Sequence, residues 1–108
     1  MFGDLMGMMG KLKETQKRVE ATRERLKTVT METTSPDGEI SVVVSADRQV
    51  REIRIADSLL ADREQLTDYL VTYLNQALQQ AGSVHDAEMA AAAREGMPDI
   101  PGMDAFLK

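Results

Sequence analysis

The sequence predicts an α+β protein whose protomer has the element order helix, three strands, helix (αβββα). Apolar residues recur at helical spacing near both ends of the chain. Between residues 29 and 56, apolar and polar residues alternate, and two turn sequences divide that stretch. The 108 residues are the length of one domain, so we expect a single domain over residues 1–108.

The first helix is predicted over residues 4–28. One set of aliphatic residues recurs at intervals of seven: Leu5, Leu12, Val19 and Leu26. The alternate positions of the same seam are Met8, Thr15, Thr22 and Val29, and the two threonines weaken it. We therefore expect a long N-terminal helix that packs along one seam, not an autonomous coiled coil.

The opening residues, MFGDLMGMMG, are predicted to be the first turns of this helix. A secretory signal places positive charge before its apolar stretch, whereas here Lys11 follows it. On a helical wheel the apolar residues fall in one arc: Phe2, Leu5, Met8, Met9 and Leu12. The glycines fall opposite, and each costs roughly 1 kcal/mol in a helix interior. We expect these turns to become ordered when a partner covers the methionine face.

A three-stranded antiparallel meander is predicted next, with strands over residues 29–34, 40–46 and 50–56. Ser35-Pro36-Asp37-Gly38 forms the first turn, because proline presets one bend and glycine accepts a positive φ. Residues 47–49 form the second turn.

Alternation within the strands predicts which side chains are buried. Ile40, Val42 and Val44 share one face of the second strand. In the third strand, Ile53 and Ile55 are expected to be buried and Glu52 exposed.

A second long helix is predicted from Asp62 to residue 96. Asp62 is a suitable N-cap, and Gln65 stands three residues later as in a capping box. Gly82 is expected to weaken or bend the helix. Residues 97–108, MPDIPGMDAFLK, hold two prolines and are expected to form a mobile Met/Pro/Gly tail.

The helix lengths predict an obligate homodimer. At 1.5 Å per residue the first helix is roughly 40 Å long and the second nearly 50 Å. A compact domain of this size has a radius of gyration of only about 13 Å. The helices must therefore extend past the sheet, and a second copy is the simplest partner for their exposed apolar stripes.

The composition excludes several classes of protein. The chain has no cysteine, which excludes disulfides, thiolate zinc sites and thiol catalysis and fits the cytoplasm. No apolar run is long enough to span a membrane. The one histidine, His85, is expected on the surface, and no metal-ligand spacing is present. We therefore expect no enzyme activity, no catalytic residues, no metal and no cofactor.

Positive charge is concentrated near the N-terminus. Residues 1–28 hold seven Lys/Arg against four Asp/Glu, a net charge of +3, whereas the remainder has a net charge of −8. Lys11, Arg18 and Arg25 recur at sevens and form a row that phosphates could contact. The candidate DNA-binding residues are Lys11, Lys13, Lys17, Arg18, Arg25 and Lys27. Composition alone favours an ordinary solvated helix face over a phosphate-binding one.

Three segments resemble the YbaB/EbfC family of nucleoid-associated proteins: MFGDLMGMMGKLKETQKR, IRIADSLLADREQLTDYLVTYLNQAL and GMPDIPGM. Their order and spacing cover nearly the whole chain. The resemblance implies an αβββα protomer that forms a tweezer-like dimer, binds DNA without catalysis and belongs to the nucleoid. It also implies DNA contacts from both helices, which points to the stretch Lys11–Lys27 and to the region of Arg94.

These observations favour a homodimer that binds double-stranded DNA mainly through phosphate contacts from the first helix. The alternative is a protein-interaction module. In that case the acidic second helix and residues 97–108 recruit a protein partner, and any DNA contact is incidental.

Overall fold

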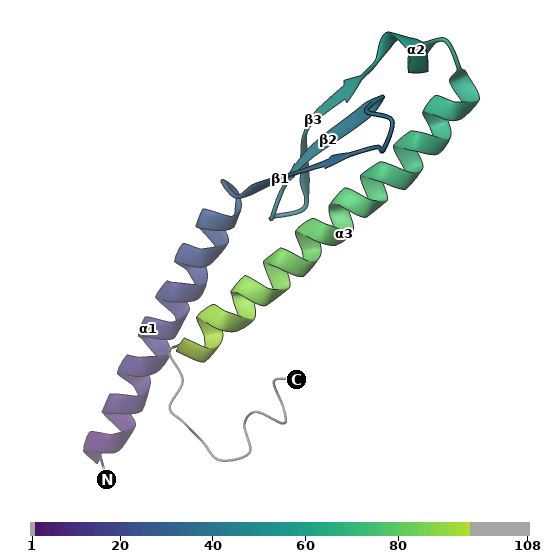
Figure 1. Cartoon of the computed structure of the whole chain (residues 1–108). Helices are drawn as coiled ribbons and strands as arrows, with labels where there is room; N and C mark the ends of the chain where they lie inside the picture. Colours follow the sequence, from purple (N-terminus) through teal and green to yellow (C-terminus); the bar gives the residue numbers. More distant parts are fainter. Residues whose placement is uncertain (1, 96–108) are drawn as a thin grey trace. The chain divides into compact units, whose positions relative to one another are not determined.

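A computed structural model describes residues 2–95, and the side chains from residue 5 onward. The elements are α1 (Phe2–Leu26), β1 (Thr30–Thr34), β2 (Ile40–Ser45), β3 (Gln49–Ile55), α2 (Asp57–Leu60) and α3 (Arg63–Glu95). Figure 1 shows this order along the chain. It confirms the predicted α+β class and the succession of helix, meander and helix. The predicted tail, residues 97–108, lies outside the described residues.

The described chain forms two compact units. One consists of residues 2–24 of α1 together with residues 86–95 of α3, and the other of residues 25–85. The expectation of one domain over the whole chain stays a prediction.

The unit of residues 25–85 contains an antiparallel sheet with the strand order β1-β2-β3. Val42 of β2 pairs with Thr33 of β1 and with Ile53 of β3. A β-bulge interrupts the second pairing, because Val43 pairs with Glu52 whereas Val44 pairs with Val50. Arg51 is the extra residue at the bulge.

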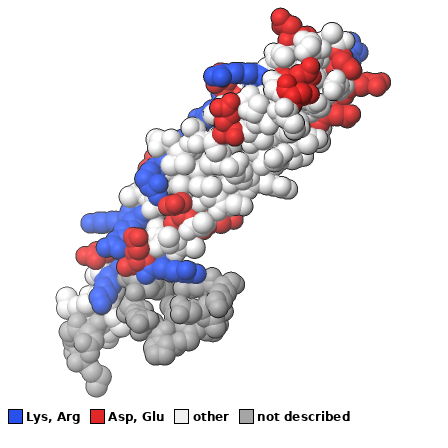
Figure 2. Space-filling view, in the orientation of Figure 1, with Lys and Arg blue, Asp and Glu red and all other residues white. Residues whose placement is uncertain are grey.

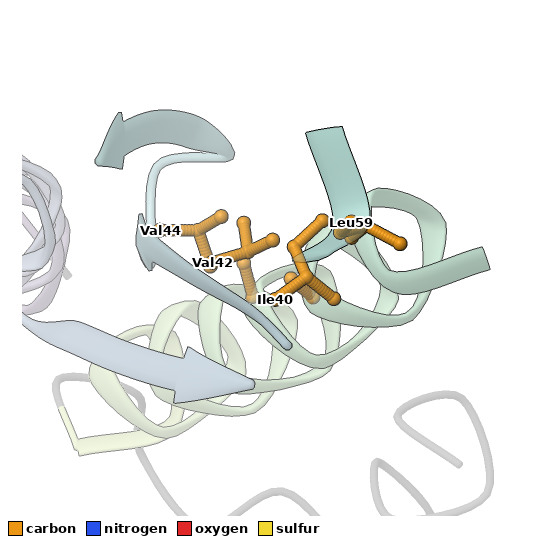
Figure 3. Packing of buried hydrophobic residues seen from close by; sticks show 6 residues of the cluster. Ile40, Val42, Val44 and Leu59 are labelled. Carbon is orange, nitrogen blue, oxygen red and sulfur yellow. The ribbon is translucent and has the colours of Figure 1, made fainter. Parts of the chain in front are cut away.

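The core of this unit lies between one face of the sheet and α3. Ile40, Val42 and Val44 are fully buried, as their alternation predicts. They form one cluster with Leu59, Ala77 and Ala81. Figure 3 shows the side chains of β2 and α2 in this cluster beside the ribbon of α3. Alanines on α3 allow the helix to lie close to the sheet.

The two predicted turns are present, and each contains one residue with a positive φ. Gly38 has φ 72° and its N–H donates to the Ser35 carbonyl at 2.9 Å. In the second turn Arg48 takes φ 62°, which is uncommon for a residue other than glycine.

β3 departs from the predicted burial. Ile53 is 40% exposed and Val50 is 43% exposed, and Ile55 is only half-buried. β3 is an edge strand, so a side chain on it has a neighbouring strand on one side only. The prediction that Ile53 is buried is wrong for this reason.

A short helix, α2, occupies the segment that joins the sheet to α3. Its Leu59 is fully buried, whereas the adjacent Leu60 is 58% exposed. The Asp62 carboxylate then accepts a hydrogen bond from the Gln65 N–H at 3.1 Å, as predicted for an N-cap. The Gln65 side chain bonds the Tyr69 hydroxyl at 3.3 Å. Gly82 lies within the continuous helix.

In the other unit, α1 is only partly covered. Thr15 and Val19 are half-buried on α1, and Ala92 of α3 is buried. Leu5 and Leu12, which belong to the same predicted seam, are each 59% exposed. The seam is therefore covered in its later turns and open in its first turns.

Candidate nucleic-acid interface

All six candidate DNA-binding residues have exposed side chains. Four of them, Lys11, Lys13, Lys17 and Arg18, lie on the part of α1 that belongs to the unit with the end of α3. Arg25 is in the last turn of α1 and Lys27 follows that helix, and both belong to the unit of the sheet.

The four cations of the first unit form two rows on α1. Successive helical residues are about 100° apart around the axis, so positions seven apart lie almost in line. Lys11 and Arg18 form one row, and Lys13 and Lys17, one turn apart, form the other. The middles of the two rows are about 130° apart around the helix. We call them the Lys11 row and the Lys13 row.

Arg18 of the Lys11 row has an acidic neighbour from α3. Its guanidinium Nη1 lies 3.8 Å from Glu95 Oε2, and both side chains are at least half exposed. Exposed ion pairs of this kind contribute about 0–1 kcal/mol, so a phosphate can replace the carboxylate at little cost.

The Lys13 row borders two shallow hollows on the helix surface. Lys13, Gln16, Lys17 and Glu20 line one of them. Met6, Met9, Gly10 and Lys13 line the other. Glu20 also binds Arg23, with 2.7 Å between Oε1 and Nη1. Figure 2 shows basic and acidic side chains intermingled on the surface, with acidic ones gathered in the region of α2.

Two arginines of the sheet have acidic partners in their own unit. The Arg54 Nε donates to Glu52 Oε1 at 2.9 Å, and this bond raises the pKa of Arg54 above its usual value. Arg51 donates through Nε to the Ser45 hydroxyl at 2.9 Å and lies 3.6 Å from Asp47. These contacts reduce the positive potential at the sheet.

The sequence predicted which cations to consider but missed their division into two rows. The spacing of Lys13 and Lys17 contained that information, because residues four apart share a helix face and residues two apart do not. The hollows could not be predicted from spacing alone, since they depend on the side-chain conformations.

Residues 2–95 contain no group of three or more His, Asp or Glu side chains arranged to hold a metal ion. Within the same residues, no helix is both long enough and apolar enough to cross a membrane.

An αβββα chain with exposed cations on its first helix defines a class of small α+β protein suited to a polyanionic ligand. The model of the YbaB/EbfC DNA-binding family matches residues 1–97, and the chain belongs to this family. The family is defined by DNA binding and not by an enzymatic reaction.

Relatives from several bacteria match over nearly their full length. A nucleoid-associated protein of Flavobacterium johnsoniae is 54% identical over 97% of this chain and 99% of its own. One from Bordetella avium is 31% identical over 95% of both chains. The crystal structure of an uncharacterized protein from Helicobacter pylori has a TM-score of 0.62 and 25% identity, covering 70% of this chain and 90% of the other.

Proposed function

We propose that this protein binds double-stranded DNA in the nucleoid as a homodimer, mainly through phosphate contacts from α1. The observation that carries the proposal is the pair of exposed cationic rows on that helix. The relatives named nucleoid-associated proteins and the family description support the same ligand.

Phosphate contacts fit the residue types on α1. Each Lys or Arg that neutralises a phosphate releases counterions from the DNA, and this release supplies binding free energy without reading the sequence. Residues 11–27 contain no aromatic side chain on which an unpaired base could stack. The helix is therefore better suited to a duplex than to a single strand.

The two rows also suggest how α1 approaches the duplex. Because their middles lie about 130° apart, the two rows face different directions, and we expect them to contact different phosphate strands. A helix between the two strands of a groove would present one row to each, and the major groove, about 12 Å wide, admits an α-helix. The residues between the rows include Gly7 and Gly10, which allow a close approach of the backbone.

The experiment removes each row separately. The variants are Lys11→Gln/Arg18→Gln and Lys13→Gln/Lys17→Gln, and the control is Arg54→Gln/Arg63→Gln, which removes the same charge elsewhere. Affinity for a random duplex is measured by fluorescence anisotropy over a series of salt concentrations.

Each row variant should weaken binding, because two phosphate contacts are lost per protomer. The slope of log K against log salt should fall by about 1.8 for each protomer that contacts the duplex, and so by about 3.6 for the homodimer. The control should retain both its affinity and its slope. Unchanged binding in both row variants would show that the site on α1 is wrong.

The homodimer is proposed from the sheet as well as from the helix lengths. Within the described residues β3 is an edge strand, so the backbone groups on its outer side have no strand partner there. Val50 and Ile53 expose apolar surface on this strand. A second copy that pairs along β3 would satisfy the backbone groups and cover these side chains together.

A further inference from the structure

The first turns of α1 expose a large apolar surface. The five apolar side chains from residue 5 to residue 12 are all between 55% and 74% exposed: Leu5, Met6, Met8, Met9 and Leu12. Contiguous apolar surface on a soluble protein usually marks an interaction site. Methionine adapts its shape to the partner, which favours an irregular or extended ligand.

Two shallow hollows lie on one side of this surface, and we call them together the groove. The hollow lined by Met6, Met9, Gly10 and Lys13 shares Lys13 with the hollow that Lys17 lines. A Cβ placed at Gly10 would have no atom within 4 Å, so the glycine leaves the floor of the groove open. The groove is apolar near the start of α1 and basic further along.

We propose that residues 97–108 of this protein bind in this groove. The segment reads MPDIPGMDAFLK, with the apolar residues Met97, Ile100, Met103, Phe106 and Leu107. Pro98 and Pro101 have no backbone N–H and fix φ, which favours an extended ligand over a continuation of α3.

The segment begins close enough to reach the groove. Glu95, the last residue of α3, lies beside Arg18 of α1. Figure 1 shows the end of α3 beside the middle of α1, whose first turns extend beyond it. From Arg18 back to Met6 the helix rises about 18 Å. Twelve extended residues span up to about 40 Å.

Tethering and charge both favour this ligand. A short linker holds a segment at an effective concentration in the millimolar range, so weak contacts suffice. The segment carries Asp99 and Asp104 against a single cation, Lys108. Lys13 and Lys17 line the groove and complement this net negative charge.

The test does not involve DNA. Lys13 also belongs to the proposed DNA site, so a docked segment would compete with DNA under that proposal. Docking of the segment is therefore measured without DNA. A negative result then bears on the docking alone and not on the proposed DNA site.

The first experiment compares the full chain, labelled with ¹³C-methyl methionine, with the variant Ile100→Ser/Phe106→Ser. The NMR signals of the Met6 and Met9 methyl groups should shift in the variant, while Met31 of β1 should not. The control Ala105→Ser should leave all three unchanged. Unchanged Met6 and Met9 signals would overturn the proposal. Shifts of these signals with protein concentration would also overturn it, because a second copy would then cover the groove.

The reciprocal experiment changes the groove and observes the segment. In Met9→Gln, the Met103 methyl signal should move toward that of a synthetic peptide of residues 97–108. Glu14→Gln, at a residue that lines neither hollow, should leave Met103 where it is in the unaltered chain. If Met103 already matches the free peptide in the unaltered chain, the segment is not docked and the proposal fails.

Discussion

Asp37 connects the first hairpin turn to α3. Its carboxylate accepts hydrogen bonds from the Ser35 hydroxyl at 2.6 Å, the Glu39 N–H at 3.1 Å and the Tyr69 hydroxyl at 2.5 Å. These bonds favour the ionised carboxylate and lower the pKa of Asp37, with Ser35 the largest contributor. The hydrogen bond that the Tyr69 hydroxyl donates to Asp37 in turn favours the neutral phenol and raises the pKa of Tyr69.

This contact predicts a pH dependence of stability at both ends of the scale. A carboxyl whose pKa is lower in the folded state stabilises above its unfolded pKa of about 3.9, and that stability is lost as the pH falls through the folded value. The raised pKa of Tyr69 gives stability below about pH 10, which is lost as the pH rises through the folded value.

We therefore expect Tyr69→Phe to weaken the dependence of the free energy of unfolding on pH in the acid and alkaline ranges. Urea denaturation at a series of pH values measures it. Tyr73→Phe is the matched control, since that ring lies 5.4 Å from Tyr69 between centroids. Equal pH profiles for the two variants would show that the Asp37 contact does not contribute.

Two glycines within helices, Gly10 of α1 and Gly82 of α3, differ in the space around them. A Cβ at Gly82 would lie 3.0 Å from Nε of Arg48, whereas a Cβ at Gly10 has no atom within 4 Å. Replacing glycine by alanine in a helix interior gains about 1 kcal/mol where space allows. Gly10→Ala should realise that gain, and Gly82→Ala should gain less or lose stability.

The cause can be isolated with Arg48→Gly, since glycine accepts the positive φ at this position. In that background, Gly82→Ala should stabilise by the full amount of about 1 kcal/mol in urea denaturation. If Gly82→Ala gains as much with Arg48 present, the close approach imposes no constraint.

At the scale of elements, the local sequence pattern predicted where the strands lie. It predicted less well which strand faces are covered by other parts of the chain. Alternation placed Ile40, Val42 and Val44 on the buried face of β2, and the structure confirms it. The same rule failed for Ile53, because alternation shows which face a residue occupies but not whether that face is covered. Coverage depends on the position of β3 at the edge of the sheet.

Two adjacent leucines of the short helix α2 test whether burial in the core stabilises this part of the fold. Leu59 is fully buried in the core cluster, and Leu60 beside it is 58% exposed. Leu59→Ala should lower the free energy of unfolding by about 2–5 kcal/mol through lost burial and a cavity. Leu60→Ala should change it by less than about 0.5 kcal/mol. Comparable losses for both would mean that Leu59 is not a core anchor.

At the scale of the whole molecule, the proposed dimer predicts that a substitution on β3 can prevent association without unfolding the protomer. Ile53→Lys places a charge on the exposed edge strand without entering the core. We expect it to yield a monomer in light scattering while far-UV circular dichroism keeps the mixed helix and strand signal. Thr67→Lys, on the exposed surface of α3, is the control and should remain dimeric. A dimeric Ile53→Lys protein would move the interface away from β3.

The sequence by itself determined the succession of elements, the two turns and the concentration of cations in the first helix. Those features depend on local propensity, capping and periodicity, which neighbouring residues set. It also predicted most of the β2 core, because a strand between two others has both sides paired.

Only the tertiary structure decided which apolar residues stay exposed and how the cations are distributed in space. Val50, Ile53 and the first turns of α1 have the composition of buried segments, yet within the described chain much of their surface faces solvent. Burial is a property of what packs against a residue, and packing joins segments far apart in the chain. The exposed methionines of α1 and the open edge of β3 follow from that difference, and they are the surfaces on which the proposed contacts depend.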